Sequence, residues 1–164
     1  MVQTDPHAVV ADRIATEREI WRAIVADVGE ERMEEPGPMG DWTFRDLASH
    51  LLGWREHFIA RLEAAGAGLP EPPTPWPSDL DSDDDVNAWI RARDLDRPLR
   101  DVLDDVDRSY ERVGRAIASL PVDLVVRSDA FSWMGGEALA ESDLFSHLHH
   151  EHEASIRAWL AERG

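Results

Sequence analysis

The chain has 164 residues, 43% of them hydrophobic, and its 34 acidic against 17 basic side chains give a formal net charge of -17. This length suits one domain with an adequate core, and the composition excludes a largely disordered chain. Such a negative charge repels phosphate backbones and anionic lipid, and no basic patch offsets it. We therefore expect no nucleic acid and no membrane among its partners.

Cysteine is absent, which excludes disulfides, thiolate metal ligands and a cysteine nucleophile, and fits a reducing compartment. No stretch approaches the roughly 18 consecutive apolar residues of a membrane span. The first seven residues lack the basic start and the apolar run of a signal peptide. We therefore expect a cytoplasmic protein, with a single domain over residues 1–164.

The first part of the chain predicts two long amphipathic helices. The first follows Asp5, a capping side chain with a proline directly after it, and ends at Gly29. A break rich in proline and glycine comes next. The second helix begins at Thr43, which forms a capping-box-like pair with Asp46, and ends near Gly66.

The rest of the chain predicts a crossover and two more long helices. Residues 66–83 contain five prolines and dense negative charge, so we expect an extended segment, followed by a short helix at about 84–94. A third long helix is predicted at 98–120, a loop at 122–136 and a last helix at about 137–163. The sequence thus predicts an all-α four-helix bundle, with a long crossover between helices two and three and a short extra helix within it.

Histidine is the most informative residue type, because four of the seven histidines fall between positions 147 and 152. A helical stripe with steps of four, three, four and three residues is expected to face inward; its members are Phe145, His149, His152, Ile156 and Trp159. In the second helix His50 interrupts an apolar run, so it too is expected to face the core. Helical periodicity therefore selects His149 and His152, and turns His147 and His150 toward the polar side.

Three inward histidines on two helices suit one divalent cation, with a coordination position left open for water or substrate. This interpretation makes His50, His149 and His152 metal ligands, with His149 alternatively a catalytic general base. A metal-free interpretation stands beside it, in which the same side chains are buried neutral histidines that hydrogen-bond to carboxylates or carbonyls.

Four further side chains are candidates for substrate binding. Trp54 lies one turn beyond His50, where it is expected to form a wall of the cleft. Trp133 lies in a loop with paired glycines, so it either covers a ligand or plugs the core. Asn87 in the short helix and Tyr110 in the third long helix are expected to add polar contacts, although Tyr110 alternatively only packs.

Several motifs resemble one known group of bundles. The segment 42–54 (WTFRDLASHLLGW) resembles the second-helix motif of the DinB/YfiT-like superfamily. Three further pieces look like its ClbS/DfsB branch: residues 86–90 (VNAWI), the pair Ser109-Tyr110, and residues 151–160 (EHEASIRAWL). The pieces occur in family order, and the similarity covers essentially the whole chain.

The resemblance implies a bundle that is often a homodimer. It also implies a divalent metal, Zn or Ni, held by one histidine of helix two and two ligands of helix four, and a low-molecular-weight thiol co-substrate. His50 matches the helix-two position. The helix-four pair is usually four residues apart, but Leu148 stands where His152 would need its partner. His149 is one replacement, and Asp143 with His147 supplies the other candidate pair.

The function expected from these observations is a DinB-like enzyme that hydrolyses a reactive small molecule or conjugates it to a thiol, for detoxification or self-protection. The alternative belongs to another class: a non-catalytic protein that binds or sequesters a small molecule in the same cleft.

Overall fold

The computed structural model of the protein describes residues 4–162, which form an all-α bundle with one small hairpin. The last three helical elements follow one another without a break, and we call residues 143–162 the C-terminal helix. The helical elements in chain order are α1 (Pro6–Val28), η1 (Glu30–Arg32), α2 (Phe44–Gly66), α3 (Asp83–Asp94), α4 (Leu99–Ala118), α5 (Val122–Val126), η2 (Ser132–Met134), η3 (Asp143–Ser146), η4 (Leu148–Glu153) and α6 (Ala154–Glu162).

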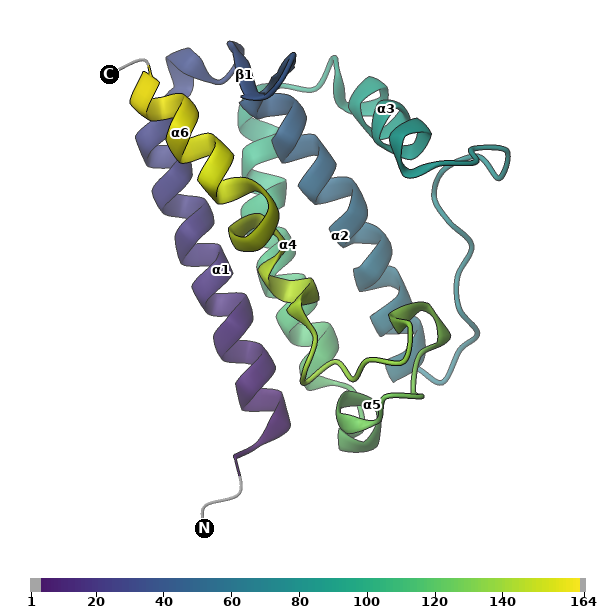
Figure 1. The fold of residues 1–164 in the computed structure, drawn as a ribbon. Coiled ribbons are helices and arrows are strands. Elements are labelled where there is room, and N and C mark those ends of the chain that lie inside the picture. The colour runs from purple at the N-terminus through teal and green to yellow at the C-terminus, as the bar shows by residue number, and fades with distance from the viewer. Residues whose placement is uncertain (1–3, 163–164) are drawn as a thin grey trace.

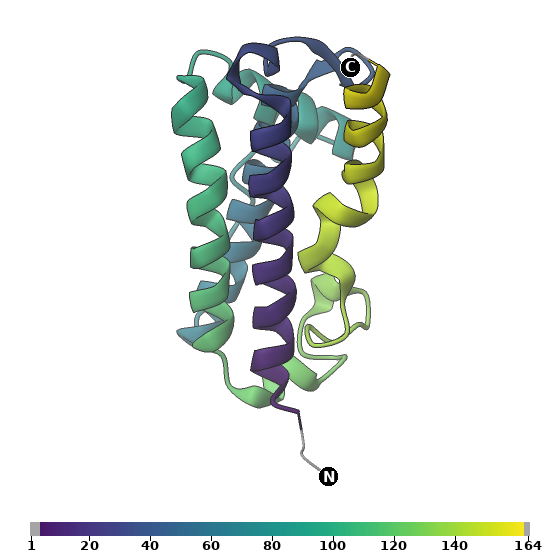
Figure 2. The same cartoon turned by 90° about the vertical axis from the view of Figure 1, so that its left-hand side faces the viewer.

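The path of the chain confirms the predicted bundle and its crossover. In Figure 1, α1 and α2 run antiparallel, and the segment after α2 then returns along the outside of the bundle to α3. As a result α4 runs in the same direction as α2, and the C-terminal helix returns alongside α1. Figure 2 views the bundle from the side of α1 and shows α1 between α4 and the C-terminal helix. The short helix expected in the crossover is α3.

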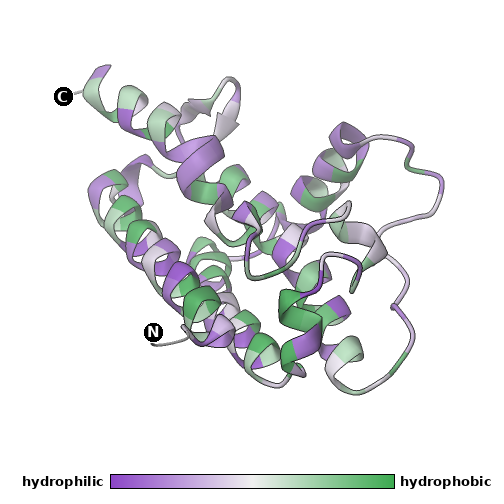
Figure 3. Ribbon diagram, turned by 60° about the horizontal axis from the view of Figure 1, so that its bottom comes forward, coloured by the Kyte–Doolittle hydropathy of each residue, from purple (hydrophilic) through white to green (hydrophobic). Residues whose placement is uncertain are grey.

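The core lies between the four long segments, each of which buries its apolar residues. Green and purple bands alternate along the helices in Figure 3, as amphipathic helices require. Trp21 stacks on Phe44 with 5.5 Å between ring centroids, and Trp159 is also buried, as its place in the predicted inward stripe requires. No helix within residues 4–162 is long and apolar enough to cross a bilayer.

The start of α2 has the cap that the sequence predicts. The Asp46 N–H donates to Thr43 Oγ1 at 3.1 Å, and the Thr43 N–H donates to Asp46 Oδ2 at 3.0 Å. These two bonds satisfy amide groups that lack a partner inside the helix. The cap fixes where α2 begins, and therefore the position of His50 two turns later.

Three local features differ from the prediction. A hairpin of β1 (Pro36–Met39) and β2 (Trp42–Thr43) replaces the expected break, and α5 forms within the expected loop. The C-terminal helix begins at residue 143 rather than near 137, because two glycines at 135 and 136 adopt positive φ angles and Ser142 caps the later start by accepting the Leu144 N–H. The predicted end of this helix at Arg163 lies outside the described residues.

The hairpin closes one end of the bundle against the C-terminal helix. Gly37 adopts a φ of 142°, and a Cβ there would lie 2.3 Å from Trp159 Nε1. Only glycine therefore allows the strand to cross the indole so closely. Because Gly37 and Trp159 are far apart in the sequence, periodicity alone did not indicate this contact.

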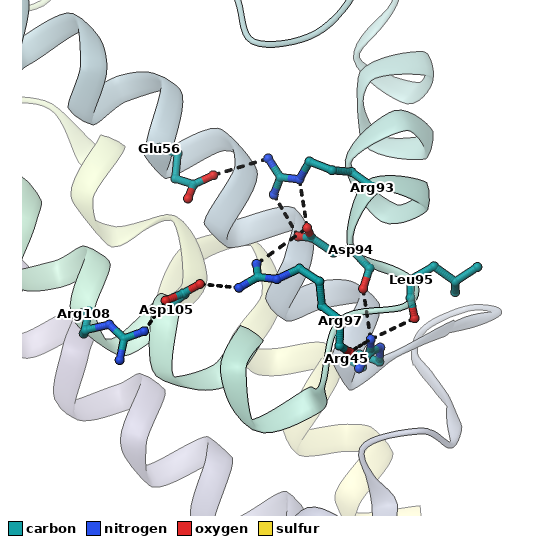
Figure 4. Close-up of polar contacts among 8 residues, drawn as sticks. All are labelled: Arg45, Glu56, Arg93, Asp94, Leu95, Arg97, Asp105 and Arg108. Carbon is teal, nitrogen blue, oxygen red and sulfur yellow. Dashed lines mark hydrogen bonds and ion pairs between the residues drawn. The ribbon is translucent and has the colours of Figure 1, made fainter.

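Arg45 of α2 attaches the end of α3 to the bundle. Its buried guanidinium donates to the carbonyl oxygens of Asp94 and Leu95 at 3.0 and 2.9 Å, and to that of Arg97 (Figure 4). One side chain thus satisfies three carbonyl groups at the C-terminal end of a helix, where intrahelical donors are missing.

A charged network continues from this point to α2 and α4. The Asp94 carboxylate is only 2% exposed and accepts hydrogen bonds from Arg93 Nε and Nη2 at 2.9 and 2.8 Å. Arg93 also reaches Glu56 of α2 at 3.3 Å, and Arg97 pairs with Asp105 of α4 (Figure 4). Paired in this way, the buried Asp94 carboxylate holds α3 in one position.

Close packing brings α3 against α2 one turn before the C-terminal end of α3, at Ile90. A Cβ at Gly53 would lie 2.7 Å from two side-chain carbons of Ile90, which is 1% exposed. The missing side chain at Gly53 therefore sets the distance between the two helices. This distance matters because α3 also carries Asn87.

We predict that Gly53→Ala destabilises the protein by about 1–3 kcal/mol, because the added methyl group collides with a buried, branched side chain. The matched control is Gly114→Ala in α4, where nothing lies within 4 Å of the added Cβ. There the substitution should stabilise by about 0.5–1 kcal/mol, since alanine loses less backbone entropy on folding. Urea unfolding of both variants measures the difference, and equal effects would contradict the account.

Candidate functional site

Three histidine side chains meet at the edge of the bundle's interior: those of His50 and His152 are buried, and that of His147 is exposed to solvent. His50 comes from α2, and His147 and His152 come from the C-terminal helix. One ring nitrogen of each lies within 4.8 Å of the other two. The Nε2 atoms of His147 and His152 are 3.1 Å apart, and the His50 ring centroid lies 5.9 and 5.5 Å from theirs. We call these residues the histidine triad.

The triad exists because the C-terminal helix changes its pitch at this point. Residues Leu148–Glu153 form η4, a π-helical segment. A π-helix has about 4.4 residues per turn rather than 3.6, so residues five apart lie close to one face. His147 and His152 are five apart, and the wider turn brings their imidazoles together. The spacing of four that the family resemblance implied is here a spacing of five.

The same change of pitch makes the inward placement predicted for His149 wrong. Its side chain is 53% exposed and its Nδ1 lies 2.6 Å from Glu153 Oε2, outside the triad. Leu148 is fully buried at the level where His149 was expected. The alternative pair of Asp143 and His147 is correct in one member only. His147 belongs to the triad, whereas the side chain of Asp143 is 83% exposed.

Glu17 of α1 supports the beginning of the π-helical turn. Its Oε1 accepts the backbone N–H groups of Leu148 and His149 at 2.5 and 3.4 Å. The residue is 2% exposed, and burial raises the pKa of its carboxyl group. A carboxylate in this position satisfies amide groups that the wide turn leaves without close partners.

Asn87 fixes the tautomer of His50. Asn87 Oδ1 lies 2.8 Å from Trp54 Nε1 and 2.9 Å from His50 Nδ1. An indole N–H only donates, so the Asn87 atom facing it is the carbonyl oxygen, which only accepts. His50 Nδ1 must then carry the proton, and in the neutral ring Nε2 keeps its lone pair. Such an orienting contact is typical of metal-binding histidines.

All three imidazoles favour the neutral form. Burial lowers the pKa of His50, although its contact with Asn87 opposes this. Desolvation and the two neighbouring rings lower the pKa of His152 to about 4, and desolvation lowers that of His147. At pH 7 the triad thus presents uncharged nitrogen donors, which is the form that binds a metal.

A cavity of about 300 Å³ opens beside the triad between α1, α2, α3, α4 and the C-terminal helix. His50 and His147 contribute to its wall, and so do the predicted residues Trp54, Asn87 and Tyr110. The apolar part of the wall suits the body of a small organic molecule, and two members of the triad, His50 and His147, face the same space.

Trp133 is the predicted substrate-binding residue that does not line this cavity. Its ring packs on Phe58 with 5.4 Å between centroids, and the Arg61 guanidinium lies 5.0 Å from its ring centre. Phe58 itself does line the cavity, so Trp133 supports the wall from behind. Of the two interpretations of this residue, the hydrophobic plug fits the structure.

Sequence reasoning missed three residues at the cavity. Trp76, in the proline-rich crossover, packs on Trp54 with 5.0 Å between ring centroids, and no periodic pattern pointed to it. Glu17 and Arg55 line the wall. Arg55 had a signal that could have been used, because it follows Leu51 by four positions and so places a charge on the apolar stripe of the helix.

Comparison with protein families identifies the chain's relatives. Residues 14–154 match the family model of the mycothiol maleylpyruvate isomerase N-terminal domain, which is most of the chain. The chain belongs to this family. The family is part of the DinB/YfiT-like superfamily and is linked to mycothiol-dependent enzymes, so the superfamily expectation is confirmed. No curated protein and no solved structure matches the chain.

We predict that long-range ¹H–¹⁵N NMR of the metal-free protein at pH 7 shows His50 protonated at Nδ1. This is the less common form of free histidine, and here the Asn87 oxygen selects it. In Asn87→Leu, which removes the acceptor, the Nε2-protonated form should gain population. Asn87→Asp keeps an acceptor oxygen and should keep the wild-type tautomer. A wild-type His50 protonated at Nε2 would contradict this assignment.

Proposed function

We propose that the protein is a metal-dependent enzyme that conjugates a low-molecular-weight thiol to a reactive small molecule in this cavity, or hydrolyses that molecule. The observation that carries the proposal is the meeting of three imidazoles, two of which line a largely apolar cavity. Membership of the mycothiol isomerase domain family supports a thiol as co-substrate.

The donor set fits a divalent metal. In a tetrahedral zinc site with Zn–N distances of about 2.0–2.1 Å, nitrogen ligands lie roughly 3.3 Å apart. The His147 and His152 nitrogens, at 3.1 Å, are close to this value, and a ring nitrogen of His50 lies within 4.8 Å of both, so it would move toward them on binding. His50, His147 and His152 would hold the ion. A zinc ion bound by three imidazoles keeps an open position, where it lowers the pKa of a thiol or water.

The side chains around the triad favour catalysis over simple sequestration. A binding protein with buried structural histidines would engage them with carboxylates. Among the described residues, the triad members contact one another and Asn87, whereas the carboxylate partners belong to the exposed His149 and His150. The triad imidazoles thus have no carboxylate partner among the described residues, and His147 and His152 hydrogen-bond to each other through Nε2.

The cavity wall positions the substrate and excludes water. Trp54 is held by its bond to Asn87 and covered by Trp76, so an aromatic wall stands next to His50. Such a wall orients the apolar body of a substrate and keeps water from the reacting atoms. We also propose that the enzyme acts in the cytoplasm, because this reducing compartment keeps low-molecular-weight thiols reduced. A chain without cysteine needs no disulfides and is compatible with that location.

We predict that the purified protein binds one zinc ion per chain, and that His147→Ala or His152→Ala weakens the affinity by about 100-fold or more. The matched control is His149→Ala, which removes a neighbouring histidine outside the triad and should bind zinc like the wild type. Competition with a chromophoric chelator measures the affinities. Loss of binding in the His149 variant with retention in the His147 variant would overturn the assignment.

Catalysis is tested with the zinc-loaded protein, mycothiol and a model electrophile such as monobromobimane. The proposal expects thioether formation above the uncatalysed rate, its loss in His147→Ala, and its retention in His149→Ala. Zinc binding without any acceleration, over a panel of electrophiles and hydrolysable esters, would instead support the sequestering function.

A further inference from the structure

One cation of the cavity wall forms no ion pair with a carboxylate among the residues that the structure describes. All basic residues of the chain are arginines, and Arg55 of α2 lines the cavity. Every other arginine that the structure describes either pairs with a carboxylate or, like Arg13, donates to backbone carbonyls. In a chain with 34 acidic residues, an arginine that forms no ion pair with a carboxylate is unusual.

The groups around Arg55 hold it in place without neutralising it. Its Nη1 donates to Ser109 Oγ at 2.8 Å, and that hydroxyl donates to the Val106 carbonyl at 2.6 Å. The guanidinium carbon lies 3.8 Å from the centre of the Tyr110 ring, in a cation–π contact. Both contacts are with neutral groups, and the Glu17 carboxyl interacts with the guanidinium only electrostatically, without an ion pair.

The Glu17 carboxylate also lines the cavity, but its hydrogen bonds are with backbone N–H groups. Glu17 forms no ion pair with Arg55, and its Oε1 accepts the Leu148 and His149 N–H groups. Tyr110 is 3% exposed, and its hydroxyl has no hydrogen-bond partner among the described residues. A buried hydroxyl without a partner is costly, and a bound oxygen would satisfy it.

We propose that Arg55 binds a single carboxylate of the substrate, with the Tyr110 hydroxyl as a second donor. Guanidinium groups bind carboxylates in a planar, two-point geometry. The charge favours a monoanion over a phosphate, because only one cation faces the cavity while Glu17 and Asp83 also contribute to its wall. This inference rests on the proposed function and narrows its substrate class.

The position of Arg55 also sets the length of that molecule. Arg55 follows His50 by five residues, which is about 7.5 Å along an α-helix. A substrate that reacts at the triad while its carboxylate lies on Arg55 therefore spans a distance of this order. An aromatic or short aliphatic body between the two groups would contact Trp54.

The first test uses 3-phenylpropionate and its neutral isostere 3-phenylpropionamide as probes. Ligand-observed NMR titrations are made with the full chain, once metal-free and once loaded with zinc. We expect the carboxylate to bind the metal-free protein about tenfold or more tightly than the amide, as a charge-assisted hydrogen bond implies. Equal affinities, or no saturable binding of the carboxylate, would overturn the proposal.

Variants then assign the preference to one side chain. Arg55→Gln should abolish the preference for the carboxylate, and Tyr110→Phe should reduce it several-fold. Arg112→Gln is the matched control, because Arg112 pairs with Glu63 at the surface and should keep the wild-type preference. If Arg55→Gln does not fold, Arg55→Lys keeps the charge and should retain part of the preference. An unchanged preference in both Arg55 variants would contradict the assignment.

The two proposals fail separately. Loss of the carboxylate preference with intact zinc binding would remove the anion site and leave the metal-dependent enzyme. Absence of zinc binding with an intact preference would remove the metal site and keep an anion-binding cavity. Binding of the carboxylate only in the zinc-loaded protein would place it on the metal and overturn the role of Arg55.

Discussion

The π-helical turn at Leu148–Glu153 is the constraint on which the rest of the site depends. An α-helix through the same residues would separate His147 from His152 and turn one of them toward solvent. The wide turn is less favourable than regular helix, and π-helical segments are therefore rare. Here Glu17 accepts two N–H groups at its start and Leu148 fills the core beneath it. A contact between the first and last helices thus stabilises the geometry of the functional histidines.

The second helix is fixed by a separate chain of contacts that ends at His50. The cap at Thr43 sets where α2 begins, and Gly53 lets α3 approach closely. Arg45 and the buried Asp94 then attach α3 to the bundle at its far end. The consequence is that Asn87 reaches both His50 and Trp54 with one oxygen. Residues far from His50 in the sequence therefore determine which of its ring nitrogens is free to face His147 and His152.

Most of the fold follows from local signals, whereas the site depends on a departure from them. Capping residues, prolines and apolar stripes predicted the long helices and the crossover, because each is a property of neighbouring residues. His50 was predicted correctly, since α2 is regular. Periodicity turned His147 toward the polar side, and only the family resemblance offered it as an alternative ligand, because periodicity assumes 3.6 residues per turn and a change of pitch supported by Glu17 is a tertiary effect. Trp76 and Gly37 were missed for the same reason: their partners are distant in sequence.

The central claim is that His50, His147 and His152 form one metal site, and X-ray absorption of the zinc-loaded protein tests it most directly. The account predicts three imidazole nitrogens at about 2.0–2.1 Å and one further light ligand. His147→Ala should lower the number of imidazoles by one, whereas His149→Ala should leave the spectrum unchanged. A wild-type spectrum with fewer than three imidazoles, or one altered by the loss of His149, would contradict it.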